Sequence, residues 1–141
     1  MQSHVRAIDR NIETTNIWLN ELSNELHAED KEEAWNCLNA VLRTIRDRLP
    51  AEDAVHFAAQ LPTLIRGSYY EGWRPSEAPH KWRHKEDYLA AVRDRMPGRD
   101  KMDIEEAVRA VLRVAGHHMN EEEIRKIKSI HPKDVWDLWP V

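Results

Sequence analysis

Apolar side chains recur every three or four positions along most of the chain, which is the spacing of one face of an α-helix. The first clear stretch contains Trp18, Leu19, Leu22 and Leu26, whose spacing predicts the first helix of the chain. A second predicted helix spans about 31–48, and its apolar positions cover more than half of its circumference, so we expect it to lie centrally. Asp30 and Glu33 have the spacing of a capping box, in which each side chain accepts a hydrogen bond from the other residue's backbone N–H.

Two shorter helices are predicted to follow. Pro50 suits the first turn of the third helix, because no intrahelical partner is lost there. The fourth helix is expected to start at Pro62. A proline disfavours helical backbone in the residue before it, so the third and fourth helices should meet at a sharp corner.

The same pattern recurs 70 residues further along, where Ala-Val-Leu-Arg at 40–43 is repeated at 110–113. Few positions are identical, but the apolar positions coincide, and a packed core constrains those most. We therefore predict an all-α fold of about eight helices, arranged as two tandem four-helix repeat units in one compact domain. The predicted segments are a helical extension (1–13), a first unit (14–72), a connector (73–83) and a second unit (84–141).

Composition excludes several classes of protein. With 4 Gly and 7 Pro, the chain has too few turn residues for an all-β domain. One Cys excludes an internal disulfide and a Cys-rich zinc module. No apolar run approaches a membrane span, and the N-terminal residues have no apolar core of a secretory signal. We expect a soluble, cytoplasmic protein that does not bind membranes.

Charge argues against nucleic acid as a partner. The formal net charge is −4, and only residues 66–101 have more basic than acidic side chains. This local excess is small and no basic recognition helix stands out, so no nucleic acid partner is expected.

Residues 66–74 combine aromatic, acidic and arginine side chains, which can supply stacking, cation–π contacts and anion recognition. The candidate binding residues are Arg66, Tyr69, Tyr70, Glu71, Trp73 and Arg74. The alternative is a purely structural role, in which Gly72 ends a helix, Trp73 packs on the other unit and Arg66 pairs with Glu71.

No metal site or cofactor is expected. The weak alternative is a metal held by His80 and His84, which have helical i,i+4 spacing. The neighbouring Lys81, Arg83 and Lys85 would repel a cation. No catalytic residue is predicted, since Cys37 falls within the central helix and paired glutamates fall in first turns, where they favour the helix dipole. Whether the protein is an enzyme is left open, and the sequence favours a non-enzyme.

The strings Ala-Ala-Gln-Leu-Pro at 58–62 and Tyr-Tyr-Glu-Gly-Trp at 69–73, with Ala-Val-Leu-Arg at 40–43, are similar to a bacterial family, domain of unknown function 2267. The resemblance covers about residues 14–139. It implies a small all-helical protein with two related halves and brings no established activity. The second half departs from the first, because it does not repeat the Tyr-Tyr-Glu-Gly-Trp string.

The sequence favours a non-enzymatic interaction module, acting on a protein partner or as a homo-oligomer. One alternative is a small-molecule or anion-binding module that uses the segment Arg66–Trp73. A second alternative is an enzyme of unknown class.

Overall fold

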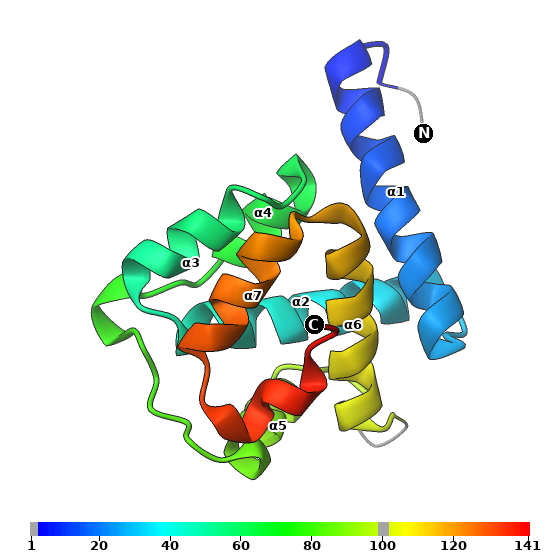
Figure 1. Ribbon diagram of the computed structural model, residues 1–141. Helices are drawn as coiled ribbons and strands as arrows, with labels where there is room; N and C mark the ends of the chain where they lie inside the picture. Colours follow the sequence, from blue (N-terminus) through cyan, green and yellow to red (C-terminus); the bar gives the residue numbers. More distant parts are fainter. Residues whose placement is uncertain (1–2, 99–101) are drawn as a thin grey trace.

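The computed structural model describes residues 3–98 and 102–141, so the first two residues of the predicted extension lie outside it. The helices pack into one body (Figure 1), and no strand occurs in the two described ranges. The α-helices are α1 (Arg6–Leu26), α2 (Lys31–Arg48), α3 (Ala51–Ala58), α4 (Thr63–Tyr70), α5 (Lys85–Asp94), α6 (Ile104–His118) and α7 (Glu121–Ile130). Among the residues described, the 3-10 helices are η1 (Pro75–Glu77) and η3 (Lys133–Leu138). The all-α prediction is confirmed.

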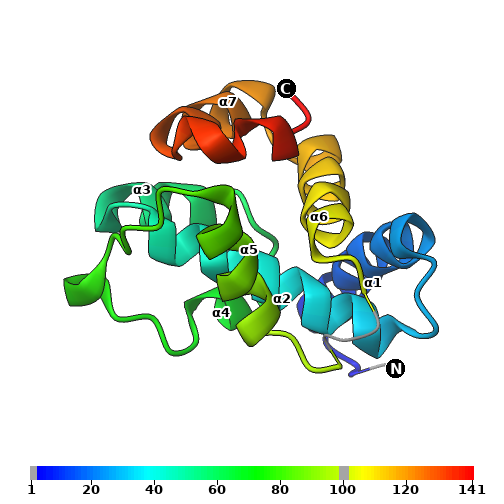
Figure 2. The same cartoon turned by 90° about the horizontal axis from the view of Figure 1, so that it is seen from below.

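The central element is α2, which packs against α1, α3, α4, α5 and α6. It crosses the middle of the molecule in both views (Figures 1 and 2). Cys37, Val41, Leu42 and Ile45 have no exposed surface. This position agrees with the wide apolar face that the sequence predicts for residues 31–48.

The helix starts follow the capping residues closely. Asp30 accepts a hydrogen bond from the backbone N–H of Glu33 at 2.9 Å, and Asp103 does the same for Glu106 at 3.2 Å. The second half of the predicted capping box is wrong, because the Glu33 carboxylate accepts from the backbone N–H of Glu29 at 3.2 Å and not from that of Asp30. The N–H that Glu33 accepts from thus belongs to the residue before the N-cap, whereas a capping box uses the N–H of the N-cap itself.

The prolines stand just outside their helices. Pro50 and Pro62 have extended ψ values of 149° and 154° and are the N-caps of α3 and α4, so Pro50 does not occupy the first turn. The fourth helix of the predicted second unit corresponds to the segment after Pro132, which is the 3-10 helix η3 and not an α-helix.

Some residues 70 positions apart share the same burial, as Leu42 and Leu112 do, and also Phe57 and Ile127. However, the elements of the two predicted units interleave, because α1 packs on α6 as well as on α2, and α5 packs on α2. The arrangement in two tandem units therefore stays a prediction.

The first turns of α1 extend beyond the rest of the molecule (Figure 1). Helix α1 runs without interruption from Arg6, so residues 6–13 belong to the same helix as residues 14–26. Its buried side chains are Thr15, Trp18, Leu19 and Leu22, all in the C-terminal part. In contrast, Val5 and Ile8 are 50% and 48% exposed.

Candidate functional site

The aromatic residues at the end of α4 gather into one row. Tyr69 has no exposed surface, and its hydroxyl donates to the carbonyl of Ala54 at 2.8 Å. The Tyr69 ring lies 5.4 Å from that of Tyr70, which lies 5.5 Å from that of Trp73. Burial raises the pKa of Tyr69 far above its usual 10, so this phenol stays neutral.

The chain reverses immediately after this row. Gly72 has a φ of 73°, a left-handed conformation that glycine adopts without a steric cost. The reversal places the half-buried Trp73 against the core. Its indole Nε1 is buried and has no hydrogen-bond acceptor among the residues that the structure describes. The expected position of Gly72 at a helix end agrees with this geometry.

The charged members of the segment point to different places. Arg66 donates to the carbonyls of Ala58 and Leu61 at 3.0 and 2.7 Å, so it caps the end of α3. The expected ion pair between Arg66 and Glu71 is therefore wrong, and Glu71 instead pairs with Arg43 at 3.3 Å.

Arg74 is exposed and lies 3.8 Å from Glu77. The structure thus brings Tyr69, Tyr70 and Trp73 together, while Arg66 and Arg74 face other neighbours. A binding site formed by all six residues stays a prediction.

A buried ion pair on α2 organises this region, and sequence reasoning missed it. Arg46 and Asp47 are 5% and 7% exposed, and their side chains meet at 2.8 Å. Arg46 also donates to the backbone carbonyls of Tyr69 and Glu71 at 2.7 and 2.8 Å, which closes the end of α4. The sequence signal that could have indicated this pair is the position of the adjacent Arg46 and Asp47 within the helix predicted to be central.

Asp47 extends the same contacts to the other half of the chain. Its carboxylate accepts from Arg95 at 2.7 Å, and its backbone carbonyl accepts from the N–H of His80 at 2.7 Å. Arg95 lies 5.3 Å from the centre of the Trp82 ring, a cation–π distance. The connector and the end of α5 are therefore held on α2.

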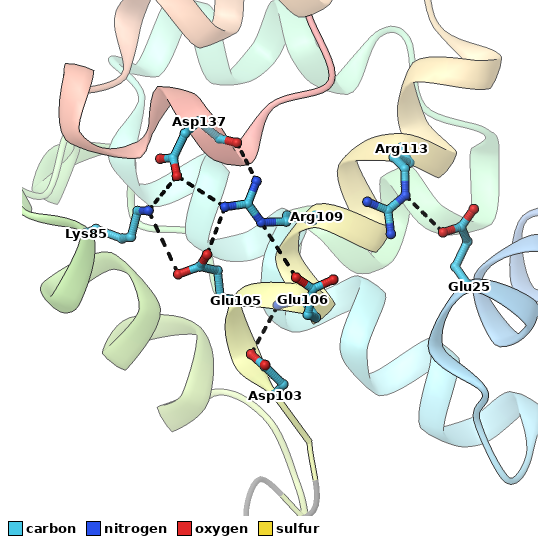
Figure 3. A network of polar contacts seen from close by, with 8 residues as sticks. All are labelled: Glu25, Lys85, Asp103, Glu105, Glu106, Arg109, Arg113 and Asp137. Carbon is cyan, nitrogen blue, oxygen red and sulfur yellow. Dashed lines mark hydrogen bonds and ion pairs between the residues drawn. The ribbon is translucent and has the colours of Figure 1, made fainter.

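A second polar network joins α5, α6 and η3 (Figure 3). Asp137 accepts from Lys85 at 2.6 Å and from Arg109 at 3.1 Å, and Arg109 also pairs with Glu105 at 2.8 Å. The hydrogen bond from Lys85 is the main reason why the pKa of Asp137 lies below its usual value. These side chains satisfy one another, which is typical of a structural network.

One histidine is buried. Both ring nitrogens of His131 form hydrogen bonds. Nδ1 lies 2.9 Å from the carbonyl oxygen of Ile127, and Nε2 lies 3.2 Å from the Tyr88 hydroxyl. Because a carbonyl only accepts, Nδ1 carries the proton. Burial lowers the pKa of His131 to about 4, so the ring is neutral near pH 7.

The histidines of the weak metal alternative do not lie on one helix. The backbone before α5 is irregular at His80, whose ring stacks on Trp82 at 4.9 Å, and His84 is the N-cap of α5. Within residues 3–98 and 102–141, no three or more His, Cys, Asp or Glu side chains form a group that could hold a metal ion.

The single cysteine, Cys37, is buried within α2 and is not reactive. Cys37 has no exposed surface, and burial raises the pKa of its thiol to about 12. Its thiolate, the nucleophilic form, is therefore absent near neutral pH.

Two hollows of different character adjoin the N-terminal half of α2, and Asn36 lines both. One has a volume of about 700 Å³ and lies between the α1–α2 turn and the start of α6. Its acidic side chains are Glu25, Glu29, Asp30, Glu32, Glu33, Asp103 and Glu106. Its Arg113 is already paired with Glu25 at 2.9 Å (Figure 3). Negative charge on this scale repels anions.

The other hollow, here named the α2–α4 pocket, has a volume of about 540 Å³. It contains Arg43 of α2, Ser68 of α4 and Arg95, which follows α5. Ser68 and Glu71 connect it with the end of α4, whereas the two arginines were not among the residues predicted from sequence.

Comparison with known proteins adds the family. No curated protein matches the chain. None of the helices described here is long and apolar enough to cross a membrane. The model of the family described as "Uncharacterized conserved protein (DUF2267)" matches residues 15–138, nearly the whole helical body. The chain therefore belongs to the DUF2267 family of uncharacterized conserved proteins.

Proposed function

We propose that this protein is a non-enzymatic interaction module that associates with a second copy of itself through the first turns of α1. The observation that carries the proposal is an apolar stripe that continues beyond the core. Val5, Ile8 and Ile12 stand at alternating spacings of three and four residues. Thr15, Leu19 and Leu22 extend the same spacing and are buried. The stripe is thus covered from Thr15 onwards, half-buried at Ile12, and open at Val5 and Ile8.

Charge supports a second copy as the partner. Arg6, Asp9, Arg10 and Glu13 surround the open part of the stripe, and their formal charges cancel. Two such segments meet without net repulsion, and a two-fold arrangement makes every favourable contact twice. Three helical turns bury less than the roughly 800 Å² per partner of a stable complex. We therefore expect a reversible dimer with a Kd on the order of 100 μM.

Sedimentation equilibrium tests this proposal on the full chain. From 10 μM to 1 mM, the average mass should rise from 16.6 kDa towards twice that value. Ile8→Ser should keep the protein monomeric, because it removes an open apolar side chain. The matched control is Ile17→Ser, since Ile17 is 45% exposed and lies nine residues on, about half a turn round the same helix.

The control should dimerise as the unaltered protein does. A mass of 16.6 kDa at every concentration would overturn the proposal. So would equal effects of the Ile8 and Ile17 substitutions, because the contact would then not depend on the stripe.

A further inference from the structure

The α2–α4 pocket has an excess of positive charge. Arg43 and Arg95 line it, and both side chains are partly exposed, at 30% and 28%. Glu71 is the acidic residue in its lining and stands at the rim with 76% of its side chain exposed. The neighbouring Arg46–Asp47 ion pair adds one charge of each sign. Arginines therefore still outnumber carboxylates among these described residues.

A chain of hydrogen bonds from Arg43 through Ser68 to Asn39 forms the floor of the pocket. Asn39, only 6% exposed, accepts from the Ser68 hydroxyl at 2.5 Å. Ser68 in turn accepts from Nη2 of Arg43 at 3.1 Å, and its carbonyl accepts from Nε of Arg43 at 3.1 Å. These contacts fix the guanidinium plane. In the part of the chain that the structure describes, Nη1 of Arg43 has no acceptor.

Arg95 is held just as firmly. It donates to Asp47 at 2.7 Å and to the carbonyl of Ala91 at 3.1 Å, and it lies over the Trp82 ring. Its Nε has no acceptor within the described ranges. A rigid guanidinium loses little freedom on binding, so each remaining N–H is available at a low entropic cost.

Part of the wall is apolar. The half-buried Trp35, together with Leu64 and Pro97, lines the pocket beside the arginines. Leu64 is 44% exposed. Small-molecule sites have volumes of roughly 300–1,000 Å³, and the volume of this pocket, about 540 Å³, falls in that range. Its lining is more polar than that of most such sites, which favours a charged ligand over an uncharged apolar one.

We propose that the α2–α4 pocket binds a small aromatic carboxylate, with its carboxylate between Arg43 and Arg95 and its ring against Trp35. Nη1 of Arg43 and Nε of Arg95 can each donate a charge-assisted hydrogen bond to one oxygen of a carboxylate. The indole face of Trp35 offers a stacking surface for the ring. This site uses no residue of the proposed α1 contact, so either proposal can fail without the other.

The first test is an NMR titration of the full chain with 1-naphthoate, and with neutral 1-naphthamide as the probe of matched shape. The indole N–H signal of Trp35, identified with Trp35→Phe, should shift and saturate with a Kd at or below about 1 mM. The amide should bind at least tenfold more weakly. Lack of saturation by 1-naphthoate at 10 mM, or equal binding of the amide, would overturn the proposal.

Two variants change the charge of the pocket without removing a described contact of the floor. Asn36 lines the pocket, is half-buried, and its side chain has no hydrogen bond among the described residues. Asn36→Asp should weaken 1-naphthoate binding about tenfold through repulsion. Glu71→Gln removes the acid at the rim and should strengthen it about threefold.

Glu77→Gln is the control, because this exposed glutamate pairs with Arg74 outside the pocket and its loss should leave the Kd unchanged. Unchanged binding by Asn36→Asp, or equal effects of the Glu71 and Glu77 variants, would contradict the proposed site.

Discussion

At the scale of single residues, the buried polar side chains determine how stability responds to pH. His131 is neutral in the folded protein, with a pKa of about 4 against 6.5 in an unfolded chain. Between these values the unfolded chain binds a proton that the folded protein does not bind. Stability is therefore complete above pH 6.5 and decreases as the pH falls towards 4, by about 3 kcal/mol in total.

Urea unfolding at pH 7.5 and pH 4.5 measures this loss. His131→Gln keeps a neutral hydrogen-bonding side chain and should remove most of the pH dependence that His131 causes. The exposed His56 provides the control, because His56→Gln should lose stability on acidification as the unaltered protein does. Identical pH profiles for His131→Gln and the unaltered protein would show that His131 is not the responsible group.

At the scale of elements, α4 depends on side chains of α2. The last carbonyls of a helix have no partner within it, and Arg46 supplies donors to Tyr69 and Glu71 while it pairs with Asp47. Arg46→Met leaves Asp47 with only Arg95 and the α4 end uncapped. The free energy of unfolding should fall by about 3–5 kcal/mol.

Thermal or urea unfolding measures the difference. Arg74→Met is the matched control, since Arg74 is an exposed arginine with one distant ion pair, and it should change stability by less than about 0.5 kcal/mol. Comparable losses in the two variants would mean that the buried contacts of Arg46 contribute nothing beyond those of an exposed arginine.

At the scale of the whole molecule, one continuous core joins elements from both ends of the chain. Leu42 of α2 and Leu112 of α6 are buried in the same cluster. Leu42→Ala and Leu112→Ala should each cost about 2–5 kcal/mol, because each leaves a cavity. Both variants should still unfold in one cooperative transition, since buried residues of both halves belong to one cluster.

Leu64→Ala is the control for these two changes, because Leu64 is 44% exposed. It should cost much less than either core substitution. Unchanged stability of Leu42→Ala or Leu112→Ala would show that the 70-residue register does not place these leucines equivalently.

The predicted elements agree closely with the structure where local physics decides. The predicted second helix, about 31–48, matches α2 at Lys31–Arg48. Asp30 and Asp103 cap their helices through hydrogen bonds that span only three residues. The 3-10 form of η3 and the position of Pro50 before α3 differ from prediction, because both depend on how the neighbouring chain packs.

The candidate site was predicted less well than the helices. Tyr69, Tyr70 and Trp73 are grouped as expected from their proximity in the chain. The partners of Arg66 and Glu71 are not those expected, because long side chains pair with whichever carbonyl or charge the fold brings near. Arg43 and Arg95 lie 52 residues apart and share a pocket only after folding.

The sequence by itself determined the helical class, the positions of the helices, the central role of residues 31–48 and the family. These properties follow from the period of the apolar side chains and from capping groups, which act over a few residues. Only the tertiary structure decided the buried Arg46–Asp47 pair, the neutral His131, the open stripe of α1 and the α2–α4 pocket. Each of these depends on contacts between distant segments, whose distances no local pattern specifies.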